Sequence, residues 1–136
     1  MSFRPRATVH LSHIVANWQA IDQLHPGATT AAVVKANGYG LGAARVSDAL
    51  SKAGCSTFFV AHVEEGVMVR RTLGQARRIF VLNGPAAGDV RSYREASLTP
   101  VLSSEDQVAL WTREGRGPCA LHFDTGMNRL GLPPAM

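Results

Sequence analysis

Short apolar runs alternate with stretches of helical periodicity along most of the chain. Between the runs, apolar residues recur at helical spacing, so a helix is expected in each gap. Continuous apolar strands that alternate with helices are typical of a parallel sheet whose two faces are both covered. The predicted strands are residues 30–34, 57–61, 79–82, 98–102 and 119–123.

Ahead of these strands the pattern predicts one more short strand and a long helix. Ala7 to Leu11 has the composition of a short strand, and Ser12 is expected to cap the helix that follows. The helix is expected to end at Pro26-Gly27. Its predicted apolar face consists of Ile14, Val15, Trp18, Ile21 and Leu24.

Local signals support several of the predicted boundaries. Glu64 and Glu65 fall where the first turn of a helix favours carboxylates. Ser104 followed by Gln107 predicts a capping box. Pro100 places the fourth strand at a strand start or a sheet edge.

The fold class is therefore α/β, with either a doubly wound sheet or a (β/α) barrel as the architecture. The chain has 136 residues, and a complete (β/α)₈ barrel needs about 250. In both architectures ligands bind at the carboxyl ends of the strands, so the candidate chemistry is expected there.

The composition is that of an ordinary globular domain, with 46% hydrophobic and 18% charged residues. It excludes a disordered tail, and no apolar run approaches the roughly 20 residues of a membrane-spanning helix. The first residues have no apolar core of a secretory signal, so a cytoplasmic location is expected. Cys55 and Cys119 have no metal-type spacing and are expected to be free thiols.

The net charge of +4 comes mostly from twelve arginines, since the only lysines are Lys35 and Lys52. No basic run exceeds two residues and no aromatic side chains are interleaved. This distribution favours a solvated surface over nucleic-acid binding.

Lys35 ends the apolar run 30–34 and is the first candidate for chemistry. Burial at a strand end favours the neutral amine, which can form a Schiff base with a carbonyl. The alternative is a lysine that extends from the strand end into solvent.

A glycine-rich turn follows Lys35. Gly38, Gly40 and Gly42 precede a predicted helix, and their N–H groups are expected to suit an anion such as phosphate. Tyr39 either presents its hydroxyl to that anion or packs in the turn. A lysine beside a phosphate site is what pyridoxal phosphate requires.

The last predicted strand end carries Arg129, which either clamps an anion or lies on the surface. Asp124 either caps this loop or acts as an acid–base group with His122 on the same strand face. His62, at the end of the second predicted strand, is read as a structural histidine. No metal site is predicted.

Three of these segments resemble the alanine racemase family of fold-type III pyridoxal-phosphate enzymes. The stretch 32–42 resembles the cofactor-lysine motif, 124–131 resembles a second hallmark, and 60–66 resembles the family segment Val-Ala-x-x-Glu-Glu-Gly. The resemblance runs from about Ala7 to Leu132.

The resemblance implies the N-terminal part of a (β/α)₈ barrel, with about five βα units. Residues 1–11 would carry a strand that pairs with a C-terminal β domain absent from this sequence, and residues 12–136 would form the incomplete barrel. The family works as a homodimer.

The resemblance also implies the chemistry: interconversion of L-alanine and D-alanine, which supplies D-alanine for the cell wall. Lys35 would bind pyridoxal phosphate as a Schiff base and act as the base toward D-alanine. Tyr39 would contact the cofactor phosphate, and Arg129 would bind near the phenolic oxygen and the substrate carboxylate.

The sequence departs from the family at two positions and in extent. His122 stands where many members have a lysine that orients the arginine, and Leu41 stands where many have histidine. The family's second base is a tyrosine of the C-terminal domain, so this chain alone is not expected to racemise alanine. The alternatives are another fold-type III racemase, a non-catalytic pyridoxal-phosphate protein, and a fragment without function.

Overall fold

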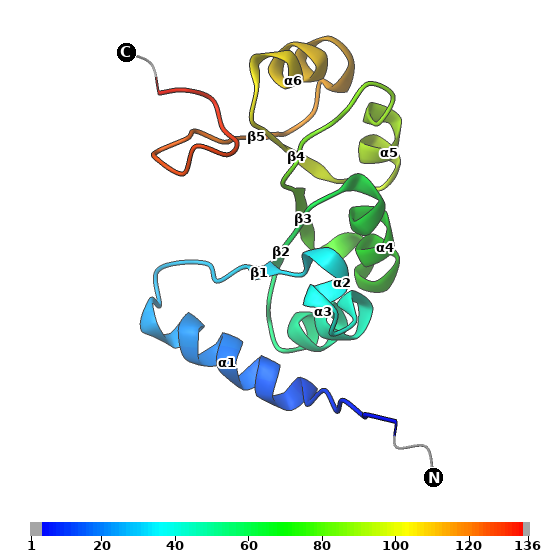
Figure 1. Cartoon of the computed structure of the whole chain (residues 1–136), viewed down its shortest axis with the longest axis vertical. Coiled ribbons are helices and arrows are strands. Elements are labelled where there is room, and N and C mark those ends of the chain that lie inside the picture. The colour runs from blue at the N-terminus through cyan, green and yellow to red at the C-terminus, as the bar shows by residue number, and fades with distance from the viewer. Residues whose placement is uncertain (1–3, 135–136) are drawn as a thin grey trace.

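Five parallel strands form one sheet in the computed structural model, which describes residues 4–134. The strands neighbour one another in the order β1-β2-β3-β4-β5, as the stack in Figure 1 shows. The predicted segments 1–11 and 12–136 include residues 1–3 and 135–136, which lie outside the described residues. The strands are β1 (Ala32–Val33), β2 (Thr57–Val60), β3 (Arg78–Val81), β4 (Thr99–Leu102) and β5 (Ala120–Leu121).

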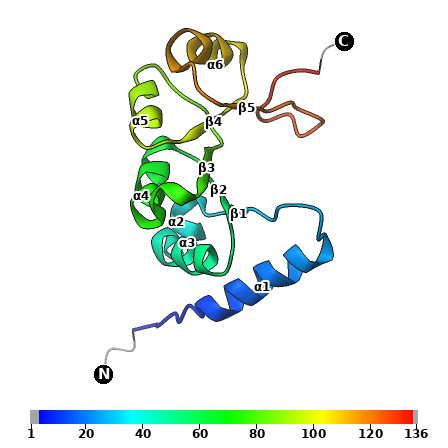
Figure 2. The ribbon, with the colours of Figure 1, turned by 180° about the vertical axis from the view of Figure 1, so that it is seen from behind.

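Helices lie between successive strands along the chain. Figures 1 and 2 show α4 and α5 on one side of the strands and the loop after β5 on the other. A 3₁₀ turn, Gly74–Ala76, follows α4, and a π-helical turn, Trp111–Gly115, follows α6. The helices are α1 (Leu11–Leu24), α2 (Lys35–Tyr39), α3 (Ala43–Lys52), α4 (Val63–Leu73), α5 (Val90–Glu95) and α6 (Glu105–Leu110).

The strand order distinguishes between the two architectures that the sequence left open. A doubly wound sheet reverses its order at a switch point. Here every new strand is added to the same edge, as in a barrel. The fold is therefore α/β and corresponds to five βα units of a (β/α)₈ barrel.

None of the helices described is both long and apolar enough to cross a membrane.

The core lies between the sheet and its helices. Along the inner strands, alternate side chains are fully buried, with Phe58 and Val60 on β2 and Ile79 and Val81 on β3. The other face of the sheet is covered less than the sequence predicted. Val33 and Leu121 on that face remain about half exposed, at 46% and 52%.

The predicted positions of the five strands are confirmed, but the outer two are shorter than expected. β1 pairs only with β2, and β5 pairs only with β4, so each has one neighbour to extend its hydrogen-bond ladder. Pro100 is the second residue of β4, near the strand start as predicted, although β4 is an inner strand.

The segment from Ala7 to Leu11 does not form a strand among the described residues, and its pairing with a C-terminal β domain stays a prediction. Residues 4–10 form neither strand nor helix, and α1 already begins at Leu11. A strand needs a partner, and no segment of residues 4–134 pairs with this one. Ser12 is accordingly inside the helix, and His10 occupies the N-cap without a side-chain bond.

Only part of the predicted apolar face of α1 packs on the core. Ile14, Val15 and Trp18 lie against it, and the indole of Trp18 donates to the carbonyl oxygen of Thr30 at 3.0 Å. The later residues of that face, Ile21 and Leu24, are 56% and 71% exposed. The helix therefore docks through its first half.

Candidate functional site

Lys35 lies two residues after the end of β1 and opens the candidate site. The last ladder contact before it is the Val34 N–H, which donates to the Phe59 carbonyl oxygen at 2.8 Å. The Lys35 side chain is half-buried, and within residues 4–134 it makes no hydrogen bond or ion pair. Its amine is therefore free to react with a ligand.

The residues after Lys35 in α2 form a left-handed turn, which the glycine spacing did not predict. Ala36, Asn37, Gly38 and Tyr39 have φ values of 51°, 53°, 64° and 54°. For residues other than glycine this conformation costs about 1–2 kcal/mol each. Strained backbone of this kind clusters at functional sites.

The predicted phosphate cradle in the glycine turn is wrong. The N–H groups of Gly38, Gly40 and Gly42 do not point at a ligand, because each donates to a carbonyl oxygen of the same loop. The side-chain oxygen of Asn37 accepts the Ala43 N–H at 3.0 Å, which caps α3. These amide donors are therefore already hydrogen-bonded within the loop. The accepting carbonyls are those of Val34, Ala36 and Asn37.

Tyr39 ends the left-handed turn with its side chain 62% exposed. The packing role considered from the sequence is therefore not observed. Its hydroxyl makes no hydrogen bond within the described residues and remains available to a ligand on the same loop as Lys35.

Glu65 is a residue of this site that the sequence placed only in a helix turn. One oxygen, Oε1, accepts the Ala36 N–H at 2.6 Å. The other, Oε2, accepts the N–H groups of Ala61 at 2.8 Å and His62 at 3.2 Å. The family-like spacing of two glutamates was the available signal, but it does not say which one turns inward.

The hydrogen bonds of Glu65 determine its electrostatics. Partial burial raises the pKa of its carboxyl, but the three backbone N–H groups outweigh burial and hold the pKa below its ordinary value. Glu65 is therefore a carboxylate over a wide pH range. Its neighbour Glu64 is exposed and accepts no hydrogen bond from residues 4–134.

The second candidate segment follows β5 and closes on itself. The Leu132 N–H donates to the His122 carbonyl oxygen at 2.7 Å, and the Asp124 N–H donates to that of Leu132 at 2.9 Å. Asp124 accepts the N–H groups of Gly126 at 2.9 Å and Asn128 at 3.1 Å.

Asp124 therefore has the loop-capping role. The N–H groups of Gly126 and Asn128 lower the pKa of its carboxyl. No hydrogen bond joins Asp124 to His122, so the acid–base pair considered from the sequence does not form. His62 is exposed, with the Asn83 side-chain nitrogen 3.4 Å from its Nε2, and its structural role stays a prediction.

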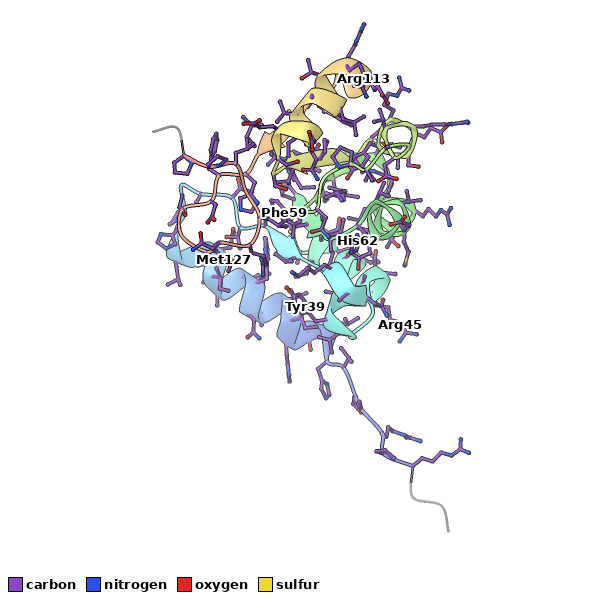
Figure 3. The ribbon with its side chains drawn as sticks, turned by 45° about the horizontal axis from the view of Figure 1, so that its top comes forward. Tyr39, Arg45, Phe59, His62, Arg113 and Met127 are labelled. Carbon is purple, nitrogen blue, oxygen red and sulfur yellow. The ribbon has the colours of Figure 1, made fainter. Side chains whose placement is uncertain are left out.

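Arg129 lies exposed in the loop after β5, without a hydrogen bond or ion pair to the described part of the chain. The structure brings Lys35 and Tyr39 together on α2. It places Arg129 at the same carboxyl edge of the sheet but after the last strand, and no contact joins it to Lys35. Figure 3 shows Tyr39 on α2 and Met127 in the loop that carries Arg129.

The two cysteines are both free thiols, as predicted, with Cys55 buried and Cys119 exposed. Between residues 4 and 134, no three His, Cys, Asp or Glu side chains are grouped to hold a metal ion. The candidate residues Lys35, Tyr39 and Arg129 offer an amine, a phenol and a guanidinium.

Comparison with protein families adds independent information about the chain. Residues 9–136 match the model of the family described as "Alanine racemase, N-terminal domain". The chain is 53% identical over 129 residues to an alanine racemase from Jannaschia sp. (strain CCS1). That match covers 94% of this chain and 37% of the relative, so the chain spans little more than a third of its length.

Solved structures share the fold. A biosynthetic alanine racemase from Pseudomonas aeruginosa matches with a TM-score of 0.84 and 34% identity, over 91% of this chain and 35% of that one. An alanine racemase from Bartonella henselae with covalently bound pyridoxal phosphate matches with a TM-score of 0.81 and 36% identity, over 90% and 36% of the two chains.

Proposed function

Because the chain belongs to the family of alanine racemase N-terminal domains, we propose that it carries the pyridoxal-phosphate lysine of an enzyme that interconverts L-alanine and D-alanine. The observation that supports this most directly is Lys35. Its half-buried amine stands at the carboxyl end of β1, where barrel enzymes place their chemistry, and has no partner among residues 4–134.

The donor chemistry of the site fits pyridoxal phosphate in three respects. The Lys35 amine suits an aldehyde, the free Tyr39 hydroxyl suits a phosphate oxygen, and the Arg129 guanidinium suits a phenolate or a carboxylate. The glycine turn does not contribute, because its N–H groups are already bonded within the loop. Further phosphate contacts must come from other groups.

Each residue has a proposed task. Pyridoxal phosphate, when bound, supplies a ring that withdraws electrons and so acidifies the Cα proton of an amino acid. Lys35 would bind the cofactor's carbonyl carbon and later take the Cα proton of D-alanine on its amine. Arg129 would orient the alanine carboxylate. Racemisation needs an acid–base group on each face of Cα, and no residue of this chain is assigned to the opposite face.

The resemblance also implies the working assembly. The proposed enzyme is a cytoplasmic homodimer that supplies D-alanine for peptidoglycan. Residues 7–10 are proposed to add to the C-terminal β domain of such an enzyme. In support, the backbone of residues 4–9 makes no hydrogen bond to the rest of the described chain.

Deuterium exchange tests this assignment without requiring the second base. The chain is mixed with pyridoxal phosphate and D-alanine in heavy water, and loss of the Cα–H signal is followed by proton NMR. We expect exchange well above that of pyridoxal phosphate alone. Lys35→Ala should abolish the excess, and Lys52→Ala, which removes the only other lysine, should retain it. Equal exchange in the wild type and Lys35→Ala would overturn the assignment.

A further inference from the structure

Glu65 holds the peptide bond that follows Lys35. Its Oε1 atom accepts the Ala36 N–H at 2.6 Å, across 29 positions of sequence. That N–H belongs to the peptide group whose carbonyl is that of Lys35. The bond therefore restricts rotation on the carboxyl side of the lysine Cα, which sets the direction of its side chain.

The same carboxylate is anchored at its other oxygen. Oε2 accepts the N–H groups of Ala61 and His62, which join β2 to α4. Because α4 packs against α3, β2 and β3, this junction is part of the packed barrel wall. Glu65 thus ties the lysine loop to the next βα unit rather than to itself.

The loop needs such a tie because its conformation is unfavourable. Ala36 and Asn37 have left-handed backbone, which L residues other than glycine rarely adopt in succession. Outside interactions must hold such a turn in place. The hydrogen bond from the Ala36 N–H to Glu65 connects the first residue of this turn to another element, α4.

The three donors also specify the residue type. All three groups that face Glu65 are N–H donors, so they require a side chain whose two oxygens both accept. Glutamine has the same shape but only one acceptor oxygen, and its NH₂ would face a donor. Glu64, one position earlier, has the same charge and none of these bonds.

We infer that Glu65 is a positioning residue for Lys35, which acts by clamping the Lys35–Ala36 peptide to the β2–α4 junction so that the lysine amine meets an aldehyde carbon in one fixed direction. This inference rests on the proposed function for its ligand, pyridoxal phosphate. It extends that function to a residue that does not itself touch the cofactor.

The test compares the two lysines of the same chain. Pyridoxal phosphate at limiting concentration reacts with an amine to form a C=N bond and one water, and borohydride reduces that bond to a stable secondary amine. Mass spectrometry of peptides then gives the Lys35:Lys52 labelling ratio. Lys52 is an internal control, because its side chain is 75% exposed and, within residues 4–134, pairs only with Asp48.

Four variants separate positioning from general stability. Glu65→Ala removes all three acceptor contacts, and Glu65→Gln keeps the shape with one acceptor oxygen. Each should lower the Lys35:Lys52 ratio by about tenfold or more, as expected when hydrogen bonds to a charged acceptor are lost. Glu64→Gln should leave the ratio unchanged. Arg70 donates to the carbonyl oxygens of Arg77 and Ser97, which precede β3 and β4 at the end of the sheet opposite Lys35. Arg70→Lys should therefore lower stability and leave the ratio unchanged.

The outcomes are distinct. The inference would be overturned if both Glu65 variants kept the wild-type Lys35:Lys52 ratio. It would also be overturned if Arg70→Lys lowered this ratio as much as the Glu65 variants do. A wild-type chain that shows no preference for Lys35 would contradict the proposed function instead. Amide exchange then decides the inference alone: the Ala36 amide hydrogen should exchange at least about tenfold faster in Glu65→Ala than in the wild type, and an unchanged rate would exclude the clamp.

Discussion

The carboxylate of Glu65 accepts the backbone N–H of Ala36 at 2.6 Å, which joins the loop after β1 to the first turn of α4. A glutamate in a first helical turn ordinarily stabilises its own helix through the positive end of the dipole. Glu65 does this and also bonds a neighbouring βα unit. One side chain therefore couples a local helix start to the geometry of the candidate site.

The stability of the chain should depend on the charge of Glu65. Because its folded pKa is lower than its ordinary value of 4.5, its contribution is complete above that pH and is lost as the pH falls through the folded pKa. The difference in unfolding free energy between the wild type and Glu65→Gln should be largest near neutral pH and narrow below about 4.5. Urea unfolding at a series of pH values measures it. Glu64→Gln is the matched control and should lower the unfolding free energy much less at neutral pH. A difference in unfolding free energy between the wild type and Glu65→Gln that grows in acid would contradict this prediction.

Asn37 should stabilise the left-handed turn in two separable ways. Asn37→Ala loses the cap on the Ala43 N–H and places alanine at φ 53°, so we expect a loss of about 2 kcal/mol in unfolding free energy. Asn37→Gly loses only the cap, and glycine tolerates the positive φ, so the loss should be about half as large. Denaturant unfolding of both variants gives the comparison. Equal losses would show that backbone strain makes no difference at this position.

The periodicity of the sequence predicted the strands well because the helix-facing side of the sheet is a continuous apolar layer. Phe58 and Ile79 are fully buried, and such residues dominate the pattern. At Ala7 to Leu11 the composition is that of a strand, but residues 4–134 contain no partner strand for this segment. Strand formation is a property of pairs, and a single segment does not reveal whether its partner is there.

The candidate site was predictable in its residue types and not in its backbone. Lys35 and Tyr39 stand out because of their position at a strand end, and the structure places them together on α2. Glycine spacing predicted free N–H groups, but the left-handed turn directs them to Val34 and Asn37 within the loop. Glu65 was missed as a site residue because its partner in the lysine loop, Ala36, lies 29 positions away, which local pattern does not encode.

Arg70 should be among the strongest contributors to stability outside the site. Its side chain is buried, and its guanidinium donates to four backbone carbonyl oxygens at 2.6–2.8 Å. Arg70→Leu leaves those oxygens without a donor and should lower the unfolding free energy by about 3 kcal/mol. The neighbouring Arg71 is exposed, so Arg71→Leu should stay within about 0.5 kcal/mol of the wild type. Similar losses in both variants would show that helix propensity or charge, rather than the carbonyl contacts, is responsible.

Tyr93 should tolerate loss of its hydroxyl but not of its ring. The side chain is fully buried, its oxygen has no hydrogen-bond partner among the described residues, and burial raises the pKa of the phenol. Tyr93→Phe should therefore leave the unfolding free energy unchanged or raise it by about 1 kcal/mol. Tyr93→Ala also removes the edge-to-face contact with Trp111 and should cost about 4 kcal/mol. A loss of more than about 1 kcal/mol in Tyr93→Phe would reveal a bonded hydroxyl.

Gly131 should fix the loop that carries Arg129, and Gly126 provides a matched comparison in the same loop. Both have positive φ, 123° and 135°, so alanine is strained at either position. A Cβ at Gly131 would lie 2.5 Å from the backbone nitrogen of Asp124, whereas a Cβ at Gly126 would meet nothing within 4 Å. Gly131→Ala must therefore separate the Asp124 and Leu132 backbones, which are joined by a 2.9 Å hydrogen bond. We expect the amide hydrogens of Asp124 and Leu132 to exchange at least about tenfold faster in Gly131→Ala than in Gly126→Ala. Equal protection in the two variants, measured by hydrogen exchange, would mean that the loop absorbs the extra carbon and that Gly131 does not position Arg129.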